Sequence, residues 1–216
     1  MKYKMVIFDW DGTLMDSIPK IVTAMQTAAA VVKVPIPTEQ QVKDVIGLSL
    51  TPAIQGLFPD ISDSDKASIL SAYRDAFLGL EEVKSPFFPG AESLIHQLHE
   101  QKVILCVATG KSRKGLERVW QSLAPMFASS ICAGEADSKP APDMIHQLMT
   151  WHDCQSETVI MIGDSVHDMR MAESAGVVRA AVTHGAHDAA QLSQYDPISV
   201  HDDLYSLQDW LMNERI

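Results

Sequence analysis

The chain has 216 residues, of which 46% are hydrophobic and 21% are charged, the composition of an ordinary globular protein. Its formal net charge of −11 argues against nucleic acid or an anionic membrane surface as a partner, because both need clustered Lys and Arg. No apolar run approaches the roughly 18 residues that cross a bilayer, and the first residues lack the layout of a secretion signal.

The first predicted element is a buried strand, Lys4–Phe8, which leads directly into the carboxylates Asp9 and Asp11. The apolar run is typical of a strand inside a sheet, and Gly12 marks the turn that ends it. Residues two apart in an extended chain point the same way, so Asp9 and Asp11 face one spot while Trp10 points into packing. Two like charges at this distance need a proton, a basic group or a metal ion to offset them.

A helical interval follows, from about Ser17 to Ser85, in which we find no convincing strand. Its strongest helical pattern is Ser64–Leu80, where apolar residues recur at helical spacing. We predict an α-helical cap over residues 17–84, inserted into a core made of residues 1–16 and 85–216. A long crossover packed rigidly on the sheet is the alternative that spacing leaves open.

The rest of the chain alternates strands with helices. The predicted strands are Val103–Ala108, Ser130–Ala133, Thr158–Ile162 and Val177–Val182. The predicted helices are Ala91–Gln101, Ser112–Leu123, Pro142–His152, His167–Ala175 and a terminal helix, Leu207–Glu214. This alternation predicts the α/β class, with a Rossmann-like parallel sheet covered by helices on both faces.

Polar residues recur where these later strands run out: Thr109 and Gly110 after one, Asp164 and Asp168 after another, with Lys139 between them. The carboxyl ends of the strands of an open α/β sheet line the ligand crevice. We therefore expect these groups to converge on Asp9 and Asp11.

Each of these residues also has an ordinary structural explanation. Thr109 or Ser112 could cap the next helix, and Asp164 or Ser165 could do the same further on. A lysine such as Lys139, in a loop before a proline, is usually exposed. The joint occurrence of all of them at strand ends is hard to obtain from helix capping alone.

In this order, the motifs resemble those of the phosphatase branch of the haloacid dehalogenase (HAD) superfamily. The matching residues are Asp9-Trp10-Asp11-Gly12-Thr13-Leu14, Thr109, Lys139-Pro140 and Gly163-Asp164-Ser165-Val166-His167-Asp168. The resemblance implies a Rossmann-like core with a mobile cap. The position of the insertion resembles the helical-cap subclass that contains phosphoglycolate phosphatase and β-phosphoglucomutase.

The resemblance also implies a reaction. Asp9 is the expected nucleophile, because a carboxylate can accept a phosphoryl group as an aspartyl-phosphate. Asp11 is the expected acid that protonates the leaving oxygen and the base that then activates water. Mg²⁺ prefers oxygen ligands, and the expected ones are Asp9, the backbone carbonyl of Asp11, and Asp164, with Asp168 acting through water or from behind the ligands.

The remaining expected contacts are with the phosphate itself. Thr109, the Gly110 amide and Lys139 are expected to bind the phosphate oxygens, and Lys139 also limits repulsion between Asp9 and the substrate. The predicted function is Mg²⁺-dependent hydrolysis of a small phosphorylated metabolite, with phosphoglycolate the first compound to test.

Two alternatives remain open from the sequence: a phosphotransferase of the β-phosphoglucomutase type, and a non-catalytic phosphate-binding relative. That mutase uses a cap arginine, and Arg74, the only arginine of this cap, lies well inside a predicted helix, which argues against mutase activity. The segment Ile46–Leu50 resembles the cap loop that faces the active site, although composition fits a simple helix–helix turn equally well.

Partner and location are also predicted. We expect a small phosphorylated metabolite as the partner, no nucleic acid, no membrane, and a monomer or weak homodimer. Three cysteines (Cys106, Cys132 and Cys154) cannot all pair with one another. Because Cys106 and Cys132 lie in apolar runs, we predict reduced core thiols and a cytoplasmic protein.

Overall fold

The computed structural model describes residues 2–80, 83 and 85–213. The predicted domain boundary at residue 84 and the predicted last helical residue, Glu214, lie outside these residues. The central element is a six-stranded sheet of order β3-β2-β1-β4-β5-β6, in which every pair is parallel. Its strands are β1 (Met5–Phe8), β2 (Ile104–Ser112), β3 (Ser129–Ala133), β4 (Val159–Gly163), β5 (Val178–Val182) and β6 (Ser199–His201). The predicted α/β class with a Rossmann-like sheet is confirmed.

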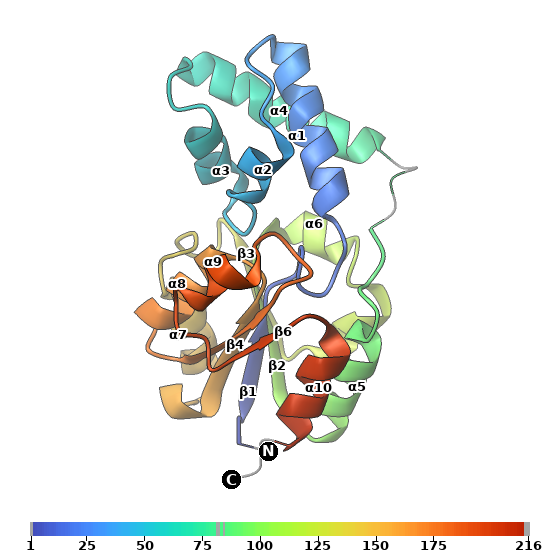
Figure 1. Cartoon of the computed structure of the whole chain (residues 1–216), viewed down its shortest axis with the longest axis vertical. Helices are drawn as coiled ribbons and strands as arrows, with labels where there is room; N and C mark the ends of the chain where they lie inside the picture. The colour runs from blue at the N-terminus through green and yellow to red at the C-terminus, as the bar shows by residue number, and fades with distance from the viewer. Residues whose placement is uncertain (1, 81–82, 84, 214–216) are drawn as a thin grey trace.

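Helices cover both faces of this sheet, and α5 and α10 lie together on one side of it (Figure 1). The helices around the sheet are α5 (Ala91–Glu100), α6 (Arg113–Glu117), α7 (Asp143–Trp151), α8 (Val166–Ser174), α9 (Ala189–Ser193) and α10 (Leu204–Asn213). Short 3₁₀ helices occur at Gln121–Met126 and Ser156–Thr158. None of the helices in the described part of the chain is long and apolar enough to cross a membrane.

The central strand β1 shows why the sheet is buried on both faces. Val6 and Phe8 belong to the hydrophobic cluster shared with α5 and α10, whereas Met5 and Ile7 belong to the cluster shared with α7 and α8. Alternate residues of a strand point to opposite faces, so an unbroken apolar run fits a strand that is covered twice.

The register of the sheet positions the functional residues. Phe8 pairs with Val107 of β2 and with Ile162 of β4. Since these strands are parallel, the residues that follow them emerge at the same edge of the sheet. Asp9 and Asp164 therefore come from neighbouring strand ends, as expected.

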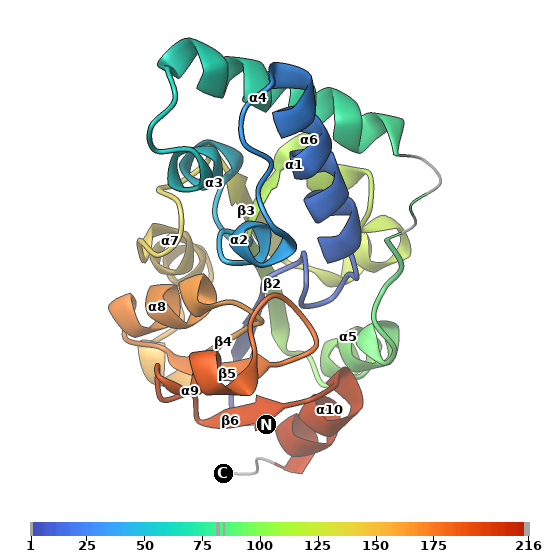
Figure 2. The same ribbon diagram turned by 45° about the horizontal axis from the view of Figure 1, so that its top comes forward.

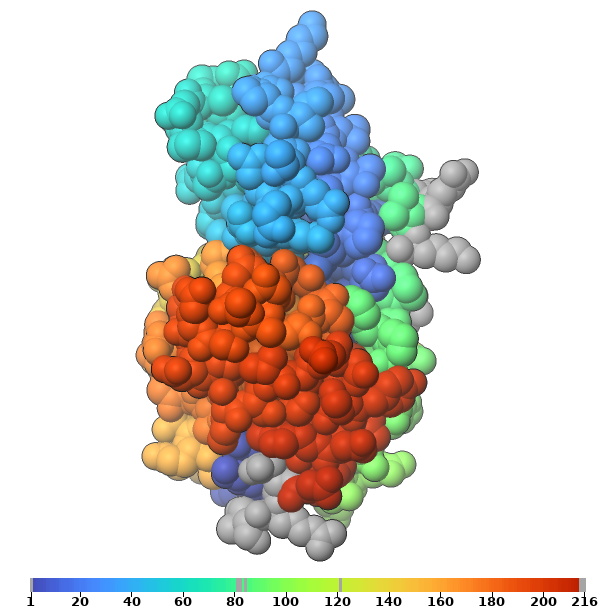
Figure 3. All heavy atoms as spheres, viewed as in Figure 1, coloured from blue at the N-terminus to red at the C-terminus, as the bar shows by residue number. Residues whose placement is uncertain are grey.

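Between β1 and β2 the chain forms α1 (Ile18–Val32), α2 (Glu39–Lys43), α3 (Leu50–Leu57) and α4 (Asp63–Gly79). These helices share a hydrophobic cluster of their own, built around side chains such as Met25, Ile54 and Ile69, and α1 packs along α4. They lie beyond the carboxyl edge of the sheet (Figure 2), and in Figure 3 they form a separate lobe that rests on the core. The division into a cap of residues 17–84 and a core of residues 1–16 and 85–216 stays a prediction and is used below as a proposal.

The predicted helix Ser112–Leu123 is wrong in its second half. Helix α6 ends at Glu117, and the backbone continues through a 3₁₀ helix at Gln121–Met126. Trp120 stacks on Phe127 at a centroid distance of 6.3 Å, within the cluster that covers the sheet. Packing of these side chains overrides local helix propensity.

Near the C-terminus, β6 and α9 were not predicted, because three and five residues are too few to give a periodic pattern. The terminal helix begins at Leu204, earlier than predicted. Asp203 accepts a hydrogen bond from the Ser206 backbone N–H at 2.7 Å, which satisfies a free donor at this helix start.

Candidate active site

Three buried carboxylates meet where β1 and β4 end. One oxygen from each of Asp9, Asp164 and Asp168 lies within 4.8 Å of the others, and the three residues are 1%, 0% and 0% exposed. The predicted convergence of these residues is therefore present in the structure.

Asp164 is held rigidly by its neighbours. The Thr13 hydroxyl donates to Oδ1 at 2.6 Å, and the Ala186 backbone N–H donates to Oδ2 at 2.7 Å. A Cβ atom at Gly12 or at Gly185 would lie 2.2 or 2.1 Å from Asp164 Oδ2. Gly12 also has a φ of +85°, which favours glycine. The backbone thus closes around this carboxylate because both neighbours lack a side chain.

Lys139 lies between the carboxylates and is 2% exposed. Its Nζ is 2.6 Å from Asp168 Oδ1 and 3.0 Å from Asp9 Oδ1. Burial alone would lower the pKa of Lys139, but the charges of Asp168 and Asp9 outweigh it and raise that pKa. The reading of Lys139 as an exposed loop lysine is wrong, since two buried anions hold the ammonium inside.

Asp168 anchors this lysine. While its Oδ1 accepts from Lys139, its Oδ2 accepts from the hydroxyl and the backbone N–H of Ser165, at 2.6 and 3.1 Å. Ser165 in turn accepts from the Asp168 N–H and forms a capping box at the start of α8. Ser165, not Asp164, is therefore the helix cap. A positively charged donor, the Lys139 ammonium, binds Asp168 Oδ1, whereas the donors to Asp164 are neutral. This difference favours the predicted indirect role of Asp168 over direct metal ligation.

The cluster carries more negative than positive charge. Burial raises the pKa of Asp9 to about 7, with Lys139 opposing the rise and Asp168 adding to it. Burial also raises the pKa of Asp164 well above its usual value, and Asp168 and Asp9 add to that rise. A bound cation would relieve this repulsion. All the ligand atoms that this cluster offers are carboxylate oxygens within 4.8 Å of one another, so the residues present fit a hard divalent ion such as Mg²⁺.

Thr109 and Gly110 lie beside this cluster on β2. Thr109 is 1% exposed, and its hydroxyl accepts from the Lys111 backbone N–H at 3.2 Å. It does not cap a helix, because β2 extends to Ser112. Ser112 is the cap of α6 and accepts from the Gly115 N–H at 3.2 Å. Of the two helix caps considered from the sequence, Ser112 is therefore the actual cap and Thr109 is not.

Asp11 forms a contact that the sequence did not predict. Lys111 Nζ lies 2.7 Å from Asp11 Oδ1 and 2.8 Å from Oδ2, and the Ser17 hydroxyl donates to Oδ1 at 2.6 Å. The Asp11 and Lys111 side chains are only 14% and 9% exposed. Lys111 belongs to the polar run after Thr109, but nothing in the sequence pairs it with a residue 100 positions away.

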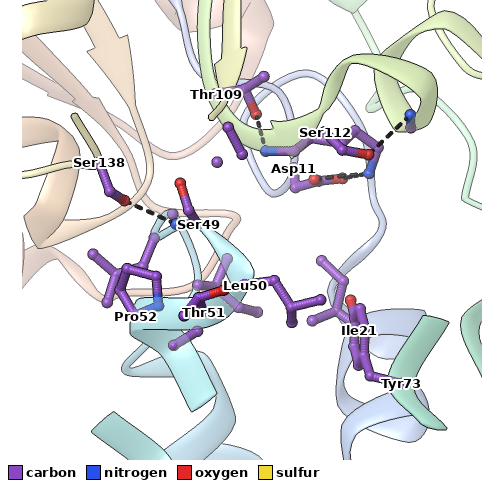
Figure 4. A pocket seen from close by; sticks show the side chains of 18 of the residues that line it. Asp11, Ile21, Ser49, Leu50, Thr51, Pro52, Tyr73, Thr109, Ser112 and Ser138 are labelled. Carbon is purple, nitrogen blue, oxygen red and sulfur yellow. Dashed lines mark hydrogen bonds and ion pairs between the residues drawn. The ribbon is translucent and has the colours of Figure 1, made fainter. Parts of the chain in front are cut away.

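A cavity of about 920 Å³ lies between α1–α4 and the core, and Asp9, Asp11, Thr109 and Gly110 line it. Its opposite wall includes every residue of the loop Ile46–Leu50, as the resemblance implied. Figure 4 shows Asp11, Thr109 and Ser138 on the core side, with Leu50 and Tyr73 facing them from the cap side. The loop is fastened to the core where the Ser49 N–H donates to Ser138 Oγ at 3.0 Å.

Three further observations concern residues that the sequence analysis considered. Arg74 of α4 lines the cavity, although its place inside a helix suggested otherwise. Trp10 is fully buried and packs edge-on against Phe87 and Phe127, which confirms that it points away from the carboxylates. Cys106 and Cys132 are free and buried, as predicted, and Cys154 is free and buried as well.

Residues 6–182 match the family described as haloacid dehalogenase-like hydrolase. The chain belongs to this family. Among curated relatives, "Phosphoglycolate phosphatase" of Vibrio vulnificus (strain YJ016) is 29% identical over 218 residues, with 95% of each chain covered. "Probable phosphatase IndB" of Dickeya dadantii (strain 3937) is 30% identical over 204 residues, covering 92% of this chain and 89% of the relative.

Solved structures show the same fold. A predicted phosphoglycolate phosphatase from Haemophilus somnus 129PT superposes with a TM-score of 0.88 at 21% identity, covering 98% of this chain and 99% of that one. A putative β-phosphoglucomutase from Bacteroides vulgatus gives a TM-score of 0.87 at 17% identity, covering 98% and 88%. The family match and the curated relatives confirm the prediction of an HAD-type phosphatase at the level of enzyme class.

Proposed function

We propose that this phosphatase is Mg²⁺-dependent and hydrolyses a small phosphorylated metabolite through an aspartyl-phosphate on Asp9. The observation that carries the proposal is the position of Asp9. It is a buried carboxylate at the wall of a large cavity, and its Oδ1 forms an ion pair with the buried Lys139 ammonium at 3.0 Å. A carboxylate oxygen at the wall of the cavity can attack the phosphorus atom of a substrate that is bound there.

In the first half of the reaction, an Asp9 oxygen forms a bond to phosphorus while the bond between phosphorus and the leaving oxygen breaks. Asp11 donates a proton to that oxygen, so the product leaves as an alcohol. In the second half, Asp11 removes a proton from water as the water oxygen bonds to phosphorus. The bond to Asp9 then breaks, which releases inorganic phosphate and restores the carboxylate.

The other residues bind and orient the phosphate. The Thr109 hydroxyl, the Gly110 N–H and the Lys139 ammonium donate to its oxygens, and Lys139 offsets the charge of Asp9 as the phosphate approaches. Asp9, the Asp11 carbonyl and Asp164 would hold Mg²⁺, with Asp168 acting behind them through Lys139 and Ser165. When bound, the ion supplies charge neutralisation for the phosphate oxygens and Asp9.

The helices α1–α4 act in this proposal as a cap over residues 17–84 that closes on the bound substrate and excludes bulk water. Curated relatives carry the name phosphoglycolate phosphatase, so phosphoglycolate is the first substrate to assay. The cavity of about 920 Å³ is in the range that accepts much larger ligands, so sugar phosphates belong in the same panel. We further propose a cytoplasmic monomer or weak homodimer.

The mutase alternative has one observation in its favour. Arg74 lines the cavity, where it is available to a second anionic group of a substrate. A mutase transfers the phosphoryl group to a sugar hydroxyl in preference to water and needs a bisphosphate activator. Release of inorganic phosphate from a monophosphate without any bisphosphate present therefore favours hydrolysis. The non-catalytic alternative predicts no turnover, and EDTA-sensitive phosphate release excludes it.

The decisive experiment is phosphate release from p-nitrophenyl phosphate and the metabolite panel, with Mg²⁺ or with EDTA. Asp9→Asn keeps the size of the side chain but removes the charge of the nucleophile, so we expect it to abolish turnover. Asp60→Asn, an exposed change in the cap, is the matched control and should turn over like the unaltered protein. Turnover in Asp9→Asn at the unaltered rate, with its fold intact by circular dichroism, contradicts the proposal.

A further inference from the structure

The ion pair between Asp11 and Lys111 joins the expected proton donor to a residue that none of the four family motifs includes. Lys111 Nζ binds both Asp11 oxygens, at 2.7 and 2.8 Å, so the ammonium determines the plane in which the carboxylate lies. The Ser17 hydroxyl adds a 2.6 Å contact to Oδ1. A carboxylate with three close donor contacts has little freedom to rotate.

The cap contributes to the same arrangement. Lys111 Nζ lies 5.4 Å from the centroid of the Phe77 ring, and Lys20 Nζ lies 4.9 Å from it. Tyr73 packs beside Phe77 on α4. Tyr73 and Asp11 line the same cavity. Aromatic side chains of α4 thus cover the ion pair when cap and core are in contact.

We propose that Lys111 is a positioning residue for general acid–base catalysis by Asp11, and that Phe77 of the cap keeps Lys111 in place. Lys111 is not assigned a bond to the reacting phosphorus or to the leaving oxygen; it acts through the orientation of Asp11. The ammonium and the Ser17 hydroxyl stay on Oδ1, while Oδ2 carries the proton to the leaving oxygen and later takes it from water. The inference rests on the proposed function, because it needs Asp11 to protonate the leaving oxygen. It also explains why Lys111 is almost completely shielded from solvent while neighbouring Lys114 is exposed.

A proton donor matters more for a poor leaving group than for a good one. An alkoxide needs its proton as the bond to phosphorus breaks, whereas p-nitrophenolate is stable without it. Loss of a residue that positions Asp11 should therefore slow alkyl phosphates selectively. Loss of a residue that only binds phosphate should slow all substrates by one factor, because the phosphate group is common to them.

The first test compares kcat for an alkyl ester, β-glycerophosphate, with kcat for p-nitrophenyl phosphate in Lys111→Met. General acid catalysis contributes roughly 10²- to 10⁴-fold, so we expect the alkyl ester to lose at least about tenfold more than the aryl ester. Lys114→Met, which also lines the cavity, is the matched control and should keep the ratio of the two rates. Lys111→Arg retains the positive charge and can donate to both Asp11 oxygens, so it should recover part of the alkyl-ester rate.

A double-mutant cycle then separates positioning from other roles. Because Lys111 is proposed to act through Asp11, Lys111→Met should cost nothing further on the alkyl ester in an Asp11→Asn background. Equal loss on both esters, or an additive loss in the double variant, overturns the inference and leaves Lys111 as a phosphate-binding or structural residue. Unchanged rates in Lys111→Met overturn it as well.

Separate controls distinguish a variant that fails to fold from a failure of the proposed function. If Lys111→Met does not fold by circular dichroism, Ser17→Ala and Phe77→Leu are used instead, since each removes one contact from the same arrangement. Both should show the selective alkyl-ester loss, smaller than that of Lys111→Met, and uniform or absent loss in both contradicts the inference. If the unaltered protein with Mg²⁺ hydrolyses neither ester and no member of the metabolite panel, the proposed function itself has failed. Activity that Asp9→Asn abolishes, without any selective loss in these variants, rejects only the role of Lys111.

Discussion

Lys139 is the residue on which the charge balance of the site depends. A fully buried lysine is rare unless it is paired, and this one is shared by Asp9 and Asp168. The pKa of Asp9 is nevertheless raised to about 7, chiefly by burial. One ammonium therefore does not fully compensate the carboxylates around it, and the folded protein is expected to gain stability from a bound cation.

Lys139→Met should destabilise the protein strongly, because it leaves buried carboxylates without a counter-charge. Breaking a buried ion pair costs about 3–5 kcal/mol, which for a chain of this size lowers Tm by roughly 6–20 °C. A carboxyl group with a raised pKa stabilises the fold while it is protonated, and this contribution is lost as the pH rises through that pKa. The loss in Tm should therefore be larger at pH 8.5 than at pH 6.

Thermal unfolding with and without Mg²⁺ checks this prediction. Added Mg²⁺ should recover part of the lost stability, since it replaces a positive charge in the same cluster. Lys43→Met is the control: its 2.6 Å pair with Glu39 is solvent-exposed, and such pairs contribute about 0.3–0.5 kcal/mol. Equal effects of the two substitutions would show that the buried pair contributes no more than a surface one.

The elements that deliver Asp9, Thr109 and Asp164 to the site could be predicted, because each residue follows an apolar strand, and parallel strands end at one edge. Lys139 was expected at the site from its place between the strand-end motifs and from the family resemblance, but its complete burial was not predicted, since its loop has no periodic pattern. The pairing of Lys111 with Asp11 could not be predicted at all. It depends on how the end of β2 meets the loop after β1, and on Phe77 from a helix in another lobe.

Close packing between β2 and a loop explains why residue 110 is a glycine. The sequence analysis considered Gly110 only as a source of a backbone N–H for the phosphate. A Cβ atom at Gly110 would lie 2.4 Å from the Leu48 carbonyl oxygen and 2.7 Å from that of Gly47. The strand β2 and the loop between α2 and α3 therefore approach each other backbone to backbone. Since backbone atoms cannot rotate away as a side chain can, an added methyl group must push the loop off the core.

Gly110→Ala should therefore impair closure of the site while leaving each lobe folded. Alanine keeps the N–H that is proposed to bind phosphate, so the substitution isolates the effect of the close approach. Displacement of catalytic geometry by about 1 Å can cost about 10²-fold, and we expect kcat/KM to fall at least tenfold with little change in Tm. Gly79→Ala is the control, because its Cβ would meet no atom within 4 Å. Unaltered kinetics in Gly110→Ala would show that the loop does not need this position.

At the scale of the whole molecule, the structure has its two lobes in contact over the reaction site. The Ser49 N–H binds Ser138 on the core, and His167 Nε2 lies 2.9 Å from the Asp44 carbonyl oxygen. These contacts lie at the loop that walls the cavity, next to Lys139. If substrate enters by separation of the lobes, the same contacts must break and re-form in every catalytic cycle.

A disulfide across this junction should stop turnover. The 3.0 Å contact between Ser49 N and Ser138 Oγ brings the two residues close enough for a Ser49→Cys, Ser138→Cys pair to meet the usual Cα spacing of about 4.4–6.8 Å. The native thiols do not compete, because all three are buried. Burial raises the pKa of Cys106 and of Cys132 to about 11 and also raises the pKa of Cys154, which leaves little thiolate near neutral pH. Phosphate release is measured on the oxidised protein and again after dithiothreitol. We expect activity only after reduction, and each single cysteine variant controls for the substitution itself. Full turnover by the cross-linked protein would mean that substrate reaches Asp9 while the loop stays on the core, and the mobile part of the cap would then have to be sought in α4 instead.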